Sequence, residues 1–190
     1  WETRDAKGLE PLRPVIEDIR GLDSFEEMKA FLSEESRSRN VPGIINLQYS
    51  VNPNDSSKYL TFLYFLGYQD LLMDPDEYEE PSEYGRQTLL RTREEVVNAL
   101  RRLDWSEEEA NAAFDGFCET EKLLSAELQS FRVMMLDDSV DENKVVDADT
   151  IQDLMKEYPI KAILQTRGYS EGEYEYINEA YLKLVGEVFN

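Results

Sequence analysis

The sequence contains no histidine, and this absence excludes more chemistry than any other feature of the composition. Without imidazole there is no histidine ligand for zinc, no histidine base to activate a serine or cysteine, and no proton shuttle near neutral pH. A single cysteine, Cys118, excludes a disulfide within the chain and a thiolate metal cluster. We therefore expect no catalytic, cofactor-binding or metal-binding residue here.

Positive charge is also scarce, because 20 Lys and Arg residues stand against 41 Asp and Glu, a formal net charge of −21. A field of that sign repels phosphate backbones and anionic lipids, so nucleic acid is not an expected partner. No apolar run approaches the roughly 20 residues that span a bilayer, so we expect no membrane insertion in this segment. The first residues show no signal pattern, which leaves the localisation open between cytoplasm and extracellular space.

The sequence has enough apolar residues to form a core, since hydrophobic residues make up 41% of the 190 residues and aromatic residues 11%. The hydrophobic spacing is mostly helical. We predict a single domain, residues 1–190, that is mainly α (α+β). Helices are predicted over residues 9–20, from 24 to about 40, from about 89 to 103, from 106 to about 130, over 150–155, over 159–168 and from 178 onward.

Side chains that accept hydrogen bonds from a first helical turn mark several of these helix starts. The sequences 24–27 and 106–109 both have the Ser-x-x-Glu pattern of a capping box. Thr150 and Asn178 are predicted to cap two later helices. Gly168 is predicted to end the helix that begins at Pro159.

Two segments change to the period of a strand. Residues 45–51 alternate apolar and polar side chains, and residues 59–65 are rich in aromatic and β-branched types. A polar stretch joins them, which predicts an antiparallel hairpin. Residues 173–177 also alternate, so we expect a small two- or three-stranded antiparallel sheet. The acidic stretches 67–82 and 137–149 are predicted to be loops.

Two helices carry apolar stripes, and the second stripe contains a carboxylate. The first stripe consists of Leu89, Leu90, Val96, Val97, Leu100 and Leu103, and the second of Ala110, Phe114, Phe117, Glu121, Leu124, Leu128 and Phe131. A carboxylate among apolar residues is costly unless a cation or donors meet it. We interpret Glu121 as buried and paired with an Arg or Lys of a neighbouring helix, in preference to a functional residue. Cys118 is interpreted as structural.

Other candidate chemistry finds little support. A calcium loop starting at Asp137 has Glu142 at its sixth position and Ala148 at its twelfth, where the motif needs Gly and Glu. The loop at Asp74 fails at Tyr78. Pairs of carboxylates for glycoside chemistry are expected by chance among so many acids. Tyr174 and Tyr176 form either a peptide-binding strand edge or ordinary strand packing, and we favour packing.

The order of several short motifs carries a family resemblance. They are Gly8-x-x-Pro11-Leu12, Asp55-Ser56-Ser57-x-Tyr59-Leu60, Gly67, the acidic loop with Pro75 and Tyr78, Thr120-Glu121-x-x-Leu124, Thr150-x-x-x-Leu154, Pro159 and Asn178-x-x-Tyr181-Leu182. This succession resembles the N-terminal region of neprilysin-like zinc metallopeptidases, a family that includes bacterial oligopeptidase O. The lack of a cysteine framework is similar to the bacterial members.

In that family the N-terminal region forms most of a helical lobe that faces a zinc-bearing C-terminal domain, and the two enclose a chamber that admits peptides. The resemblance therefore implies a non-catalytic fragment of a zinc metalloendopeptidase, with zinc expected only in the missing catalytic domain. The implied partners are that domain of the same protein and peptide substrates. The family's zinc-binding histidines have no counterpart here. Asn98-Ala99 lies mid-helix and lacks the context of the family's substrate-clamping Asn-Ala motif.

Two further functions remain open from the sequence. One is a free-standing acidic helical module that binds a basic protein partner, which the net charge of −21 suggests. The other is an independent carboxylate hydrolase, from which we expect no activity. The departures from the family lie at residues 67–75, where a Gly-Leu-x-Leu-Pro run is usual, and at Ile160, where an aromatic residue is common.

Overall fold

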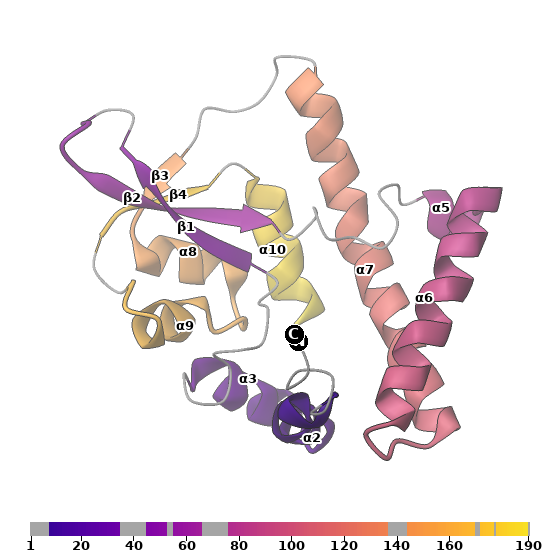
Figure 1. Cartoon of the computed structure of the whole chain (residues 1–190). Helices are drawn as coiled ribbons and strands as arrows, with labels where there is room; N and C mark the ends of the chain where they lie inside the picture. The colour runs from indigo at the N-terminus through magenta and orange to yellow at the C-terminus, as the bar shows by residue number, and fades with distance from the viewer. Residues whose placement is uncertain are drawn as a thin grey trace. The chain divides into compact units, whose positions relative to one another are not determined.

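A computed structural model describes residues 8–34, 45–52, 55–65, 76–136, 144–169, 172–176 and 178–189. The chain groups into two compact units. Unit 1 comprises Trp1–Leu22 and Asp70–Ala126, and unit 2 comprises Asp23–Gln69 and Glu127–Asn190. The predicted mainly α, α+β class is confirmed, with the helices and a small sheet shown in Figure 1.

Unit 1 is helical in its described part. It contains a 3-10 turn η1 (Glu10–Leu12), α2 (Arg13–Arg20), α5 (Asp76–Glu79), α6 (Glu83–Arg101) and the larger part of α7 (Glu107–Leu136). The predicted helix over residues 9–20 is thus divided into η1 and α2. One turn of helix, α5, interrupts the predicted loop 67–82, and α7 continues six residues beyond its predicted end.

The turn between α6 and α7 explains why both helices stop and start where they do. Asp104 adopts a left-handed conformation with φ 67°, and the Trp105 amide donates to the Leu100 carbonyl at 3.2 Å, which ends α6 in a left-handed cap. Ser106 Oγ accepts from the Glu109 amide at 3.1 Å, while Glu109 Oε2 accepts from the Ser106 amide at 2.8 Å. The predicted capping box is confirmed with both of its bonds.

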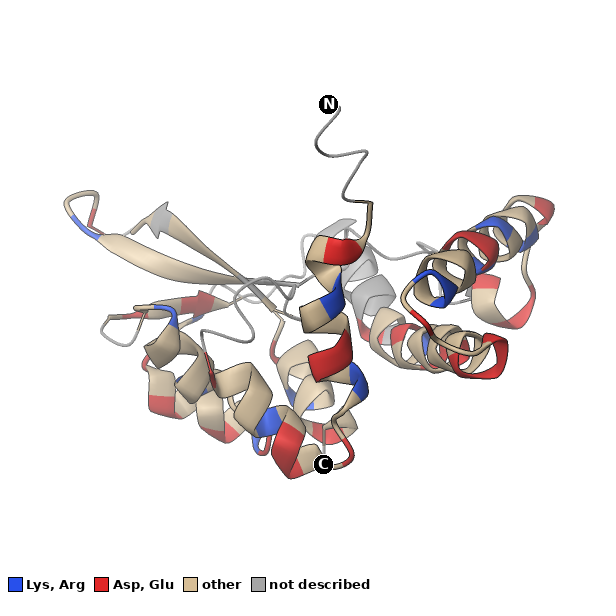
Figure 2. Ribbon diagram, turned by 60° about the horizontal axis from the view of Figure 1, so that its bottom comes forward, with Lys and Arg blue, Asp and Glu red and all other residues tan. Residues whose placement is uncertain are grey.

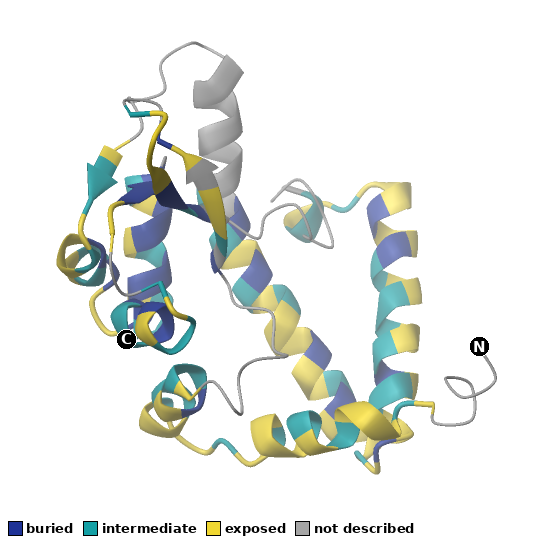
Figure 3. Cartoon of the chain, turned by 60° about the vertical axis from the view of Figure 1, so that its left-hand side comes forward, coloured by how far each residue is buried: buried dark blue, intermediate teal, exposed yellow. Residues whose placement is uncertain are grey.

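The α6–α7 pair buries narrower faces than the sequence pattern predicts. Figure 3 shows that buried positions recur along both helices, and those on the predicted stripes include Val97, Leu103, Ala110, Phe114 and Glu121. Leu90 is 63% exposed and Phe117 is 48% exposed, so their assignment to buried faces is wrong. The small residues Gly85 and Thr88 are buried in the N-terminal part of α6, where a Cβ at Gly85 would lie 3.2 Å from the Glu77 carboxyl carbon and 3.5 Å from the Pro81 Cβ.

Unit 2 contains a four-stranded mixed sheet, larger than the predicted one. Its strands are β1 (Ile45–Val51), β2 (Tyr59–Phe65), β3 (Lys144–Val146) and β4 (Tyr174–Tyr176), in the order β1-β2-β4-β3. The predicted hairpin is confirmed, with Ile45 opposite Phe65 and Val51 opposite Tyr59. β4 pairs parallel to β2 and antiparallel to β3. The end of the predicted loop 137–149 forms β3. The sequence did not predict this strand, because its pairing partner β4 lies about 30 residues later in the chain and residues 144–146 show no local strand pattern.

Helices α8 (Ala148–Met155), α9 (Ile160–Thr166) and α10 (Glu179–Val188) lie on one side of this sheet (Figure 1), and α3 (Phe25–Ser33) packs against α9. The core includes Leu63, Ile151, Met155, Leu164, Tyr174, Tyr181 and Leu182, all nearly inaccessible to solvent. This covered face anchors the hairpin and is the reason that β1 and β2 hold their register.

The capping predictions in unit 2 meet different outcomes. Ser24 accepts from the Glu27 amide at 3.2 Å, and Asn178 Oδ1 accepts from the Tyr181 amide at 3.0 Å, as predicted. Thr150 is not the cap of α8, since its amide and hydroxyl both donate to Asp147 Oδ1, three residues earlier. Helix α3 ends at Ser33, earlier than predicted, because Glu34 is already extended. Gly168 has φ 77° and ends α9 as predicted.

Candidate functional site

The residues of this chain do not fit a catalytic zinc ion. The sequence has no histidine, and the described residues contain no group of three or more Cys, Asp or Glu side chains arranged to hold a metal ion. Residues 137–143 of the calcium pattern that begins at Asp137, and residues 74–75 of the loop at Asp74, lie outside the described residues. Burial, and then the nearby charge of Glu121, raise the pKa of the Cys118 thiol, which keeps it protonated and poorly nucleophilic.

Glu121 is buried, as predicted, with 8% of its surface exposed. The structure shows a donor that the sequence did not predict, the hydroxyl of Tyr78, which donates to Glu121 Oε2. On the next residue of α7, Lys122 Nζ lies 3.0 Å from Glu79 Oε1. Two successive residues of α5 are therefore bound to two successive residues of α7. Sequence reasoning missed this because it assigned residues 67–82 to a loop.

A second set of hydrogen bonds fixes the connection from α5 into α6. Glu77 Oε2 accepts from the backbone amide of Ser82 at 2.8 Å and from its hydroxyl at 2.9 Å. The same hydroxyl caps α6 by accepting from the Gly85 amide at 3.1 Å. Glu77, Tyr78 and Glu79 thus each hold a separate partner, and we call residues 77–79 with their partners the α5 joint. The carboxylates of Glu77 and Glu79 in this joint therefore hold structural elements together.

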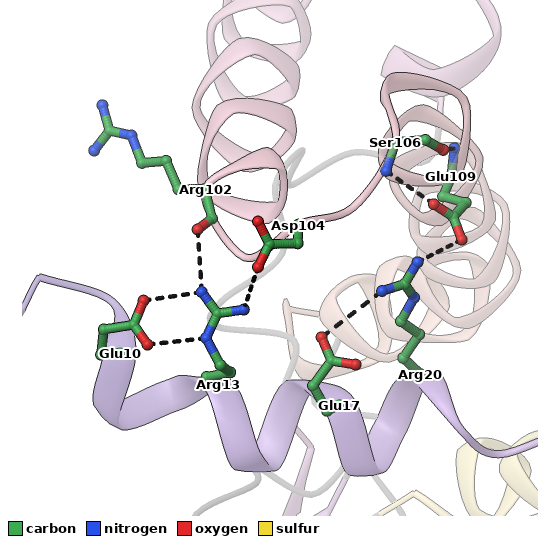
Figure 4. Close-up of polar contacts among 8 residues, drawn as sticks. All are labelled: Glu10, Arg13, Glu17, Arg20, Arg102, Asp104, Ser106 and Glu109. Carbon is green, nitrogen blue, oxygen red and sulfur yellow. Dashed lines mark hydrogen bonds and ion pairs between the residues drawn. The ribbon is translucent and has the colours of Figure 1, made fainter.

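Two arginines of α2 fasten this helix to the α6–α7 turn (Figure 4). Arg13 donates to both carboxylate oxygens of Glu10 at 2.9 Å and to Asp104 Oδ2 at 2.8 Å. Two turns further on, Arg20 donates to Glu109 Oε1 at 2.7 Å. The Arg20 guanidinium, followed by the Ser106 bonds, lowers the pKa of Glu109 to about 2. Because Glu109 also closes the capping box, one carboxylate joins α2 to the start of α7.

The most exposed aromatic surface of unit 2 is on the β1–β2 hairpin. Tyr49 is 58% exposed, Val51 48% and Tyr59 72%, and the two tyrosines line a shallow hollow of about 290 Å³. The Tyr49 ring stacks on the ring of Tyr169, with centroids 4.9 Å apart and planes 29° apart. We call Tyr49, Val51 and Tyr59 the hairpin face. Alternation over residues 45–51 identified β1 but placed Tyr49 and Val51 on its apolar side, opposite the wet face.

The tyrosines that the sequence did single out have no such exposure. Tyr174 and Tyr176 are 0% and 3% exposed, and β4 lies between β2 and β3 rather than at an edge. The Tyr174 hydroxyl donates to the Tyr169 carbonyl, and the Tyr176 hydroxyl lies 3.4 Å from Glu179 Oε2. The interpretation as ordinary strand packing is confirmed, and a peptide-binding edge at these two residues is wrong.

Asn98 and Ala99 lie within α6, as predicted, where the Asn98 carbonyl accepts from the Arg102 amide at 3.2 Å. Among the described residues no helix has both the length and the apolar character needed to cross a bilayer. The described residues thus show joints that fix helices and an aromatic surface open to solvent.

The crystal structure of the Mycobacterium tuberculosis zinc metalloprotease Zmp1 in complex with an inhibitor has the same fold over 99% of this chain, with a TM-score of 0.72 and 16% sequence identity. The match covers 28% of the mycobacterial chain. No curated protein sequence matches.

The family model for the N-terminal part of peptidase family M13 matches residues 1–190, so the chain belongs to this family. Neprilysin-like zinc metallopeptidases are the proteins of this family, and the predicted resemblance is confirmed. The chain corresponds to a part that precedes the catalytic domain, and it spans little more than a quarter of the related Zmp1 chain.

Proposed function

We propose that this chain is the non-catalytic part of a zinc metalloendopeptidase of bacterial type, in which it helps to form the helical lobe that encloses the active-site chamber. The observation that carries the proposal is the match of residues 1–190 to the N-terminal family model in a chain with no histidine. Peptide-bond hydrolysis would then take place in the catalytic domain of the same polypeptide, where zinc would polarise the carbonyl and activate water. Residues 1–190 would act as a single functional domain.

The contribution of this chain to that activity is steric. A wall that limits access to a chamber must keep its shape, and the α5 joint together with the Arg13 and Arg20 contacts supplies fixed connections within unit 1. Such a wall admits an extended peptide and excludes a folded protein, so substrate size is limited without any contact with the reacting atoms. This is why the function requires no catalytic residue here.

The charge of the chain adds a preference among peptides. Asp and Glu are distributed over the helices of both units (Figure 2), and the net charge is −21. A negative wall raises the local concentration of cationic peptides, an effect that salt screens over about 8–10 Å at physiological ionic strength. We expect rising salt to weaken cleavage of a Lys- and Arg-rich peptide by the full-length enzyme more than cleavage of a neutral peptide of equal length.

The test of the proposal uses the full-length gene product beside the 190-residue chain. We expect one zinc ion per full-length chain and cleavage of a short peptide, with no cleavage of the same sequence inside a folded protein. The 190-residue chain should bind no stoichiometric zinc and show no turnover. Stoichiometric zinc with turnover in the 190-residue chain, or a full-length product without a zinc site, would contradict the proposal.

The alternative is a free-standing acidic module, for which the net charge is the favouring observation. This function predicts saturable binding of a basic protein that disappears at high salt, with no peptidase activity in the full-length product. Zinc analysis of the full-length product therefore separates the two functions.

A further inference from the structure

The hairpin face continues the buried side of the sheet out into solvent. The β1–β2 register places Leu47 opposite Leu63 and Val51 opposite Tyr59, and residues two apart on a strand share one face. On that face Leu63 is 0% exposed, whereas Tyr59, four residues earlier on the same strand, is 72% exposed. One half of a single apolar face is covered and the other half is not.

The uncovered half is already ordered for binding. Tyr49 is held by its stack on Tyr169, whose carbonyl accepts from the buried Tyr174 hydroxyl. The hollow between Tyr49 and Tyr59 is about 290 Å³ in volume and has an apolar lining. Rigid tyrosines beside a hollow lose little conformational entropy on binding and are enriched where interfaces gain most of their free energy.

A second copy of this chain does not suit this surface. A stable complex between separate proteins buries about 1,200–2,000 Å², far more than the side chains of Tyr49, Val51 and Tyr59 provide. Two copies would also each bring a net charge of −21. A partner on the same polypeptide avoids both difficulties, because a covalent connection supplies an effective concentration in the millimolar range and a small contact then suffices.

The remaining length of the family's chain supplies such a partner. This chain covers 28% of the related Zmp1 chain, so most of that polypeptide lies outside the part matched here. We propose that the hairpin face is the docking surface for the catalytic C-terminal part of the same polypeptide, which places an apolar or aromatic side chain in the hollow between Tyr49 and Tyr59. This inference rests on the proposed function and deepens it by naming the surface at which the two parts meet.

Hydroxyl-radical footprinting of the full-length protein and of the 190-residue chain tests the docking directly. We expect Tyr49 and Tyr59 to be oxidised in the 190-residue chain and to react on the order of tenfold more slowly in the full-length protein, as exposed side chains become interface core. Tyr174, which is 0% exposed, should stay unreactive in both and so reports an intact fold. Equal oxidation of Tyr49 and Tyr59 in the two proteins would overturn the inference.

Matched variants give a second measurement. Tyr49→Ser with Tyr59→Ser should lower the melting temperature of the full-length protein more than that of the 190-residue chain, because the 190-residue chain loses only the Tyr49–Tyr169 stack whereas the full-length protein also loses the docking contact. Tyr84→Ser, at a 77% exposed position on α6, is the control and should change neither. Equal effects of the double variant on both proteins would contradict the docking. A concentration-dependent dimer of the 190-residue chain that the double variant abolishes would also contradict it, in favour of a second copy.

The docking inference and the proposed function can fail independently of each other. A full-length protein with zinc and peptidase activity but with reactive Tyr49 and Tyr59 would leave the function standing and remove the docking surface. Protected tyrosines in a full-length protein without zinc or peptidase activity would support docking to the remaining chain and remove the function.

Discussion

Gly186 of α10 lies directly against the backbone carbonyl group of Met155, the last residue of α8. A Cβ atom at position 186 would lie 2.7 Å from the Met155 carbonyl carbon and 3.0 Å from its Cα. Both residues are buried in unit 2. The two helices therefore approach at a distance that only a glycine permits.

Gly186→Ala is expected to destabilise the protein by about 1–3 kcal/mol, because the added methyl group must push two packed helices apart. Urea unfolding measures this loss. The control is Gly116→Ala in α7, where an added Cβ meets nothing within 4 Å. There the better helix propensity of alanine should stabilise by about 0.5–1 kcal/mol. If both variants gained stability, the close approach of α10 to α8 would be refuted.

Removal of the Tyr78 hydroxyl tests the α5 joint. Tyr78→Phe leaves the buried Glu121 carboxylate without this donor and should cost about 1–3 kcal/mol. Glu121→Leu should keep the fold, since leucine fills the site without a charge to satisfy, whereas Glu121→Ala should lose appreciable stability. In a double-mutant cycle with Glu121→Leu, Tyr78→Phe should cost much less than in the wild type. A full cost in both backgrounds would show that the two side chains are not coupled.

The Arg20–Glu109 contact predicts a dependence of stability on pH. The pKa of Glu109 is lowered from 4.5 to about 2, so the charged form is favoured in the folded state. Its contribution is complete above pH 4.5 and is lost as the pH falls towards 2. Glu109→Gln should therefore show a shallower loss of stability over this window than the wild type, measured as the urea midpoint. Parallel curves for the two proteins would exclude the contact as the cause.

The start of α10 depends on one capping side chain. Asn178 Oδ1 accepts from the Tyr181 amide, and Asn178→Ala should cost about 1 kcal/mol. Its Nδ2 is buried and, within the described part of the chain, has no hydrogen-bond partner. Asn178→Ser keeps an accepting oxygen and removes that donor, so it should be milder than Asn178→Ala in thermal unfolding. An equal loss in both variants would show that the side-chain volume, not the cap, is what matters.

Features that depend on a few neighbouring residues were predictable from the sequence. The cap at Ser24, the capping box at 106–109, the cap at Asn178 and the end of a helix at Gly168 were predicted correctly, because the donors and acceptors lie within one turn of each other. The Glu27 carboxylate accepts from the Asp23 amide and not from Ser24, so the box predicted at 24–27 has only one of its two bonds. The same holds for β1 and β2, whose alternation is local. The predicted helix cap at Thr150 was wrong by three residues, because the Asp147 side chain accepts the hydrogen bonds of the first turn instead.

Features that join distant segments were not predictable. The hydrogen bond between Tyr78 and Glu121 spans 43 residues, and the parallel pairing of β4 with β2 spans more than 100. The exposure of Phe117 follows from what the neighbouring helix covers and not from its own spacing. The hairpin face was missed for the same reason, because alternation shows which residues share a face but not how far other elements cover it.

By itself, the sequence determined that this chain holds no histidine-based catalytic centre, that it is mainly helical, and where several helices and the two hairpin strands begin, because composition and local hydrogen bonding fix these properties. Only the tertiary structure decided that Tyr78 donates a hydrogen bond to Glu121, that the Met155 backbone lies directly against Gly186, and that Tyr49 and Tyr59 remain exposed. Those outcomes depend on which segments pack together, and packing is a property of the whole fold.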